Sequence, residues 1–112
     1  MSQHLDKKNR SEIPVDKLSH YEILLDNDTT RITFHRIRPG EQSGWHVHDT
    51  NYVGYHMESS QLRYERSDGS VGEIQSEAGK SFFYEVGKGF EHNVTNIGDT
   101  DMVALEIEYK TI

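Results

Sequence analysis

The stretch Gly40-Glu41-Gln42-Ser43-Gly44-Trp45-His46-Val47-His48 places two histidines two residues apart, behind two glycines. A third histidine lies in a later stretch, Gly87-Lys88-Gly89-Phe90-Glu91-His92-Asn93-Val94-Thr95-Asn96. Alternate side chains of a β-strand point to the same face, so His46 and His48 can grip one ion if they lie in a strand. A neighbouring strand that carries His92 would then close a site of three imidazoles.

Outward from these two stretches, the chain reads as short β-strands separated by turns. Turn signals such as Pro39-Gly40 and Ser67-Asp68-Gly69-Ser70 break up runs that are apolar or that alternate, and helical periodicity is hard to find. This pattern is typical of sandwiches and barrels, and it predicts an all-β fold. We expect strands over residues 21–25, 31–37, 52–57, 61–66, 71–74, 81–86 and 102–109.

The chain has 112 residues, a length that predicts one domain. Residues 1–18 show no strand pattern, so we expect them to be a tail or an arm that orders only against another surface, with the barrel over residues 19–112. Within the arm, Ile13-Pro14-Val15 is expected to be extended and able to add to a sheet edge, with the edge of a second subunit as one option. Hydrophobic residues make up only 33% of the chain, a lean core that favours a homodimer.

The composition excludes several classes of protein. A net charge of −7 and a pI near 5.4 argue against nucleic-acid binding, and we expect the small basic cluster of Lys7, Lys8 and Arg10 to be solvated. Without cysteines, a metal can bind only through nitrogen and oxygen ligands. No apolar run is long enough to cross a membrane and the polar start lacks a signal peptide, so we expect a cytoplasmic protein without membrane partners.

The two histidine stretches resemble the two sequence motifs of the cupin superfamily. The first motif asks for a glycine, five residues, His-x-His, three or four residues, a glutamate, six residues and a glycine. Gly40, His46 and His48 fit this spacing, whereas Tyr52 stands in place of the glutamate and Ser59 in place of the last glycine. The missing glutamate is the most important departure.

The second cupin motif asks for a glycine, proline-x-glycine, two residues, a histidine, three residues and an asparagine. Gly89, His92 and Asn96 fit, Gly87 replaces the proline, and Gly79 lies slightly too far upstream. The resemblance implies a double-stranded β-helix, a jelly-roll-like barrel, over residues 30–110. The whole chain is also similar to small single-domain cupins of the β-alanine-degradation type, which share a His-x-His arm followed by Tyr-Val and a closing Glu-x-Glu strand.

Histidines 46, 48 and 92 are the predicted metal ligands. Neutral imidazoles bind many ions, so the cofactor is predicted to be one divalent transition metal, Fe, Mn, Ni, Zn or Cu. Three protein ligands leave coordination positions open, as a catalytic metal requires. The alternative is a barrel without a metal, in which these histidines bond to neighbouring groups.

Tyr52 is the candidate catalytic residue. A neutral phenol is a poor ligand until it loses its proton, normally near pH 10, but a nearby metal can lower that value. Tyr52 could then bind iron as phenolate, act as a general base, or hydrogen-bond to a bound molecule. Packing in the barrel mouth is the structural alternative. The resemblance bears on this choice, because cupin lyases that cleave dimethylsulfoniopropionate use a tyrosine at the metal site as base.

Other polar residues are candidates for contacts to a substrate or to the metal ligands. His56 shares a face with Tyr52 in a regular strand, although a hydrogen-bonded core histidine is the alternative. An inward Arg31 could hold a carboxylate by a bidentate contact, but an exposed arginine is the commoner state. Glu106 and Glu108 share a face with Ala104, and either could bind the metal or orient an imidazole. For Glu108 we expect exposure to solvent.

These residues predict a small metal-dependent enzyme that acts on a small organic molecule, possibly a carboxylate. Oxygenation at iron and proton abstraction leading to elimination or isomerisation are the two chemistries that we expect. The alternatives are a non-catalytic cupin that binds a small molecule or a metal, and a structural cupin without metal.

Overall fold

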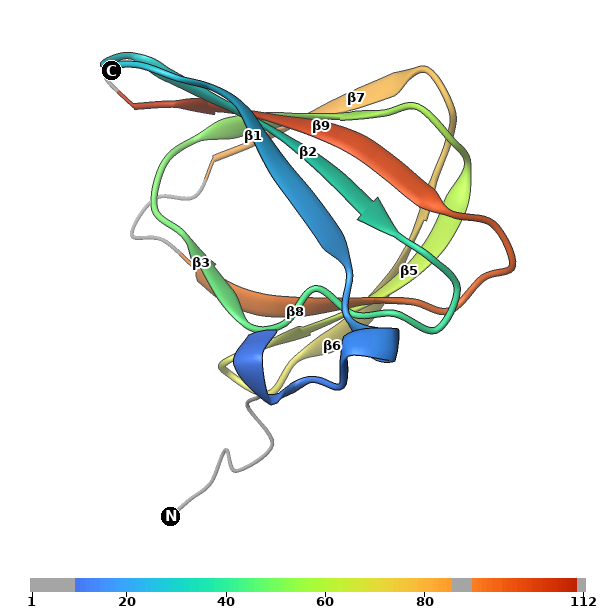
Figure 1. The fold of residues 1–112 in the computed structure, drawn as a ribbon. Helices are drawn as coiled ribbons and strands as arrows, with labels where there is room; N and C mark the ends of the chain where they lie inside the picture. Colours follow the sequence, from blue (N-terminus) through green and yellow to red (C-terminus); the bar gives the residue numbers. More distant parts are fainter. Residues whose placement is uncertain (1–9, 86–89, 111–112) are drawn as a thin grey trace.

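The computed structural model describes residues 10–85 and 90–110 and builds them into two facing β-sheets (Figure 1). The larger sheet has the strand order β1 (His20–Asp26), β2 (Thr30–Ile37), β9 (Met102–Tyr109), β4 (Tyr52–His56) and β7 (Lys80–Tyr84). The smaller sheet has the order β3 (His46–His48), β8 (Phe90–Asn96), β5 (Ser60–Arg66) and β6 (Val71–Ser76). The named strands pair antiparallel, and the predicted all-β fold is confirmed.

Strand β9 is the centre of the larger sheet, because it pairs with β2 on one side and β4 on the other. Alternation along β9 puts Met102 and Ala104 on one face, and both are buried. Glu106 and Glu108 continue this inner face toward the other end of the strand. The same sheet face is therefore apolar at one end of the barrel and acidic at the other.

The apolar core lies between the sheets at the end where β8 finishes. Ile37 from β2, Leu62 from β5 and the two buried residues of β9 form one cluster, with Val94 of β8 packed against it. Leu62 is directly opposite Asn96 in the β5–β8 register, which places this cluster beside the asparagine. The opposite end of β8 carries His92.

The described part of the N-terminal segment packs on the barrel of the same chain. Two 3-10 helices, η1 (Arg10–Glu12) and η2 (Val15–Lys17), flank Ile13, which is buried. Pro14 is the N-cap of η2 and Val15 its first residue, so Ile13-Pro14-Val15 leads into a helix and belongs to no named strand of this chain. Its predicted addition to the sheet edge of a second subunit stays a prediction. Arg10 donates hydrogen bonds to Ser19 Oγ and to the Ser43 carbonyl, 3.0 and 3.1 Å away. The division between a tail over residues 1–18 and a barrel over residues 19–112 stays a prediction.

Strand β1 forms one edge of the larger sheet and is exposed along its whole length, including Tyr21, Ile23, Leu24 and Leu25. In residues 10–85 and 90–110 no helix is long and apolar enough to span a membrane. The end of the predicted strand 81–86 and the predicted roles of Gly87 and Gly89 lie outside the described residues.

Candidate metal centre

Three histidine side chains converge where β3 pairs with β8. His46 lies directly opposite His92 in the antiparallel register, and His48 follows two residues along β3 on the same face. The Nε2 atom of His92 lies 2.9 Å from Nε2 of His46 and 3.1 Å from Nε2 of His48. The strand pairing thus brings the three predicted ligands together, with the same ring nitrogen of each turned to one point.

This spacing fits three ligands of one ion. Imidazole nitrogens bind first-row metals at about 2.1 Å, and two such atoms at a right angle are about 3.0 Å apart. The measured separations of 2.9 and 3.1 Å agree with that value. The donor set of three imidazoles and no thiolate suits a divalent transition metal without selecting one.

The loop before β3 fixes the orientation of the His46 ring. The Gly44 carbonyl can only accept a hydrogen bond, so the contact of 2.9 Å requires that His46 Nδ1 carries the proton and that Nε2 presents its lone pair. Asn93 holds this loop in place, because its Oδ1 accepts a bond of 2.9 Å from the Gly44 amide. Gly44 has a positive φ of 84°, and a Cβ there would lie 2.9 Å from the Arg10 side chain. The glycine is therefore needed at this position.

Burial keeps the three imidazoles neutral. It lowers the pKa of His46 below its ordinary value. Burial, followed by repulsion from neighbouring histidines, lowers the pKa of His92 to about 2. For His48, burial lowers the pKa to about 4 despite the opposing attraction of Glu106. Near pH 7 all three rings are neutral, so each can offer the lone pair of one ring nitrogen to a metal without first losing a proton.

Glu106 approaches the cluster from the opposite sheet. Its Oε2 lies 4.0 Å from His48 Nε2, and its Oε1 lies 3.6 Å from His35 Nε2 on β2. Burial would raise the pKa of Glu106, but the interactions with His35, His48 and His46 outweigh it and lower the pKa. The carboxylate is thus ionised near pH 7, beside the imidazoles.

Comparison with known proteins decides the family. No model of a known protein family matches the chain. The chain is 31% identical over 88 residues to the β-alanine degradation protein BauB of Pseudomonas aeruginosa, which covers 79% of this chain and 90% of BauB. A crystal structure of a cupin domain from Bordetella pertussis superposes with a TM-score of 0.75 and 34% identity, covering 83% of this chain and 94% of the other. This chain is a cupin of the family that includes BauB.

A more distant cupin shares the fold alone. Oxalate decarboxylase of Bacillus subtilis, which has Mn(II) centres, matches with a TM-score of 0.61 and 24% identity over 80% of this chain and 25% of its own length. The resemblance to the cupins is confirmed, and with it the double-stranded β-helix. Two groups of residues in this cupin could hold a metal ion, His46 with His48 and His92, and His48 with Glu106 and Glu108.

Tyr52 packs tightly beside the imidazole cluster. Its ring stacks on the His48 ring at a centroid distance of 4.5 Å and on the Tyr84 ring at 4.8 Å, with interplanar angles near 20°. Burial raises the pKa of Tyr52 well above its ordinary value, and the negative charge of Glu106 raises it further. In the cupin barrel Tyr52 is therefore a protonated phenol that lies against a predicted metal ligand.

Two cavities meet at the histidines. The first, about 340 Å³, extends from His46 and His92 past Tyr52 toward the apolar core, and His56 lies in its wall. His56 is buried, with an Nδ1 that has no hydrogen-bond partner, and burial lowers its pKa. The second cavity, about 300 Å³, lies on the side of β1 and β2. His46 and Glu106 line both cavities, so the cluster separates two spaces that small molecules could occupy.

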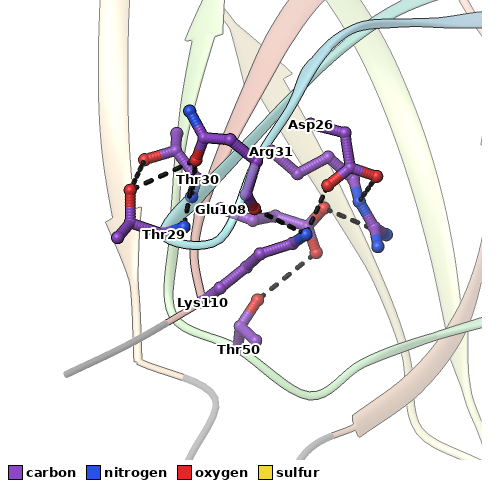
Figure 2. Close-up of polar contacts among 8 residues, drawn as sticks. Asp26, Thr29, Thr30, Arg31, Thr50, Glu108 and Lys110 are labelled. Carbon is purple, nitrogen blue, oxygen red and sulfur yellow. Dashed lines mark hydrogen bonds and ion pairs between the residues drawn. The ribbon is translucent and has the colours of Figure 1, made fainter.

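Arg31 lines the second cavity but is held by acidic neighbours. Its guanidinium lies 3.5 Å from Asp26 and 3.7 Å from Glu108, within a network that also contains Thr50 and Lys110 (Figure 2). The prediction that Glu108 is exposed to solvent is wrong, because its side chain is only 13% exposed. The cause is that the Ala104 face of β9, on which Glu108 lies, turns out to be the inner face.

Sequence reasoning missed three residues of this site. His35 contacts Glu106, Asn93 holds the loop that orients His46, and Arg66 lines the larger cavity. Arg66 is opposite His92 in the β5–β8 register, a neighbourhood that depends on strand pairing. The motifs gave no signal for any of the three; Asn93 directly follows His92, but it holds one of the unspecified positions between His92 and Asn96.

Proposed function

We propose that this cupin is a metal-dependent enzyme that acts on a small organic molecule, with a carboxylate as the favoured class. The observation that carries the proposal is the cluster of three converging, neutral imidazoles at the wall of a cavity of about 340 Å³. His46, His48 and His92 would hold the ion. A divalent transition metal bound there would polarise a substrate oxygen or, if it is iron, supply one-electron chemistry.

The lining of the larger cavity supports a carboxylate with a small apolar body. Ile37, Leu62 and Met102 form its deep apolar part. Arg66 is the only arginine or lysine among the described residues that line it, and a guanidinium is suited to binding a carboxylate. The names of BauB and of oxalate decarboxylase refer to β-alanine and oxalate, which are both small carboxylates. Arg31 is the weaker candidate for this contact, because Asp26 and Glu108 already pair with it.

Tyr52 is the proposed proton carrier of the site. Its protonated phenol lines the larger cavity and can donate a hydrogen bond or a proton to a molecule held there. His56, farther along the same wall, offers a second polar contact to such a molecule. Oxygenation at iron fits this arrangement, with Tyr52 as a donor. Proton abstraction with elimination or isomerisation would require a bound metal to lower the pKa of Tyr52, so that its phenolate can take the proton. The two chemistries differ in whether dioxygen is consumed.

A direct assay tests this proposal. The metal-free protein is loaded separately with Fe²⁺, Mn²⁺, Ni²⁺, Zn²⁺ and Cu²⁺ and incubated with β-alanine, oxalate and other short carboxylates. An oxygen electrode reports oxygenation, and proton NMR in D₂O reports exchange or elimination. We expect turnover with one of the metals. In the variant Tyr52→Phe we expect metal content to be retained and turnover to fall by about 100-fold or more, since it removes an acid/base group.

The outcomes separate the alternatives. Carboxylate binding without turnover in any loaded form would make the protein a non-catalytic binding cupin. Failure to retain any of the five metals would make it a structural cupin. Loss of the metal in Tyr52→Phe would instead make the phenol a ligand.

We also propose that the protein is a homodimer. The exposed edge strand β1, with several apolar side chains along it, supports this assembly, because unpaired strand edges readily pair with a second chain. Light scattering coupled to size exclusion measures the mass of the assembly, and a monomer would overturn the proposal.

A further inference from the structure

We propose that Glu106 supplies the carboxylate ligand of the metal centre, moved from β4, where Tyr52 stands in its place, to the neighbouring strand β9. This inference rests on the proposed metal centre of the three histidines. It adds a fourth protein ligand and assigns to Tyr52 a position beside the ion rather than on it.

The position of Glu106 between the strands is the first argument. Glu106 lies directly opposite Gly54 in the β4–β9 register, and Tyr52 lies opposite Glu108. Position 106 is thus next to the strand that carries the glutamate in the cupin motif, and its side chain, 20% exposed, points between the sheets. Because Gly54 has no side chain, β4 places no side chain directly beside Glu106 at this position.

The distance to the histidines is the second argument. Glu106 Oε2 is 4.0 Å from His48 Nε2, and ligand atoms of His48, Glu106 and Glu108 all lie within 4.8 Å of one another. Two ligand atoms on one ion are about 3 Å apart, so the carboxylate would have to move about 1 Å closer to His48 to share an ion with it.

The charge of the site is the third argument. Three neutral imidazoles leave the two positive charges of a divalent ion uncompensated in a buried place, which is unfavourable without an anionic partner. The Tyr52 ring stacks on the His48 ring at a centroid distance of 4.5 Å. Glu106 brings a carboxylate to the same histidine from the opposite sheet, with Oε2 4.0 Å from His48 Nε2.

Glu108 is the other acidic residue near His48, but its contacts assign it elsewhere. One of its oxygens lies 3.7 Å from Arg31, and the other accepts a bond from Thr50 Oγ1 (Figure 2). Its charge is thus matched by the guanidinium. Glu108 therefore serves as a control for Glu106, since both lie on the same face of the same strand.

His35 orients the carboxylate. Its Nε2 is buried and has no hydrogen-bond partner, and Glu106 Oε1 lies 3.6 Å from it. A slight approach of the two groups would satisfy this nitrogen, leaving Oε2 turned toward the histidine cluster. His35 is a positioning residue in this arrangement and does not contact the ion.

Cobalt binding tests the inference without an activity assay. Metal-free wild-type protein, Glu106→Gln and Glu108→Gln are titrated with Co²⁺ by calorimetry, and the visible spectrum of each loaded form is recorded. We expect Glu106→Gln to bind Co²⁺ about 10-fold or more weakly, with shifted absorption bands, because a charged oxygen ligand is lost. We expect Glu108→Gln to stay within about 3-fold of wild type with an unchanged spectrum. Circular dichroism checks that both variants fold.

A third variant guards against a misfolded Glu106→Gln protein. Glu106→Asp keeps the charge and shortens the side chain, and we expect intermediate affinity with a shifted spectrum. Equal affinity and identical spectra for wild type and both Glu106 variants would overturn the inference while leaving the histidine centre intact. Equal weakening in Glu106→Gln and Glu108→Gln would also overturn it, since it would reduce the effect to overall charge. If the wild-type protein itself binds no Co²⁺, the proposed metal centre fails first.

Discussion

Asn96 and His92, two polar residues toward opposite ends of strand β8, make different kinds of contact. At one end Asn96, 1% exposed, donates through Nδ2 to the carbonyls of Ile37 and Thr100 at 2.7 and 2.8 Å, and its Oδ1 accepts from the Gly98 amide at 2.9 Å. At the other end His92 turns Nε2 toward the same atom of His46 and His48. The side chain of Asn96 forms hydrogen bonds with groups of the chain itself. The three histidines instead turn the same kind of atom, Nε2, toward one point.

This difference separates structural polar groups from binding groups. A buried polar side chain whose atoms are all hydrogen-bonded stabilises a single local structure. Basic nitrogens that face one another cannot satisfy each other in the same way, since at most one proton can lie between each pair. Both residues fit the same cupin motif. Their surroundings, rather than the motif, distinguish Asn96, whose side chain is hydrogen-bonded to the chain itself, from His92, which we propose as a metal ligand.

The largest effect is expected at the open end of β8. The variant His92→Ala should bind a divalent transition metal at least about 100-fold more weakly, because it removes one of three imidazole ligands. Its circular dichroism spectrum should match that of the wild-type protein. Metal content after dialysis measures the effect, with His20→Ala, an exposed histidine of β1, as the control. Unchanged metal content in His92→Ala would remove the proposed ligand set.

At the closed end a similar truncation should act on stability instead. Asn96→Ala leaves the buried Ile37 carbonyl and the partly buried Thr100 carbonyl and Gly98 amide without the partner they have now, and each lost bond costs about 1 kcal/mol. We expect the free energy of unfolding in urea to fall by about 3 kcal/mol, while the folded fraction binds metal normally. Asn27→Ala, which removes bonds of an exposed asparagine to Thr29 and Thr30, should cost less than about 1 kcal/mol. Loss of metal binding by folded Asn96→Ala would contradict the prediction that Asn96 acts on stability alone.

The smallest effect concerns Glu41, whose carbonyl accepts the Asn96 amide at 3.0 Å. Burial would raise the pKa of Glu41, but the bonds from Arg38 outweigh it and lower the pKa below 4.5. Because the folded pKa is the lower one, the ionised group stabilises the fold above pH 4.5, and this contribution is lost as the pH falls through the folded pKa. Glu41→Gln should therefore cost about 1 kcal/mol at pH 7 and progressively less below pH 4.5. Urea unfolding at several pH values measures this, and a difference independent of pH would contradict it.

The sequence predicts which side chains lie together on a strand face better than it predicts where that face points. The spacing of His46 and His48 and the alternation of Met102–Tyr109 both hold in the structure. Alternation along β9 favours exposure of the face with two glutamates, because the opposite face is entirely apolar, whereas in the structure the glutamate face is the inner one. The buried position of Glu108 was missed for this reason.

Contacts between strands that are distant in the sequence are harder to predict than the face on which a residue lies. Arg66 beside His92, and Glu106 beside His35 and His48, follow from the order of strands in each sheet and from their register. Neither order nor register can be read from a local pattern of residues. The motif shows that Tyr52 stands where a glutamate is expected. That the carboxylate of Glu106 lies near His48 can be seen only in the folded structure.

Anomalous diffraction from crystals soaked with Co²⁺ tests the central claim most directly. The account predicts a single strong anomalous peak in each chain, bonded to Nε2 of His46, His48 and His92. A carboxylate oxygen of Glu106 is predicted to contact the same peak. A peak elsewhere in the protein, or none among these imidazoles at full soaking, would contradict the account.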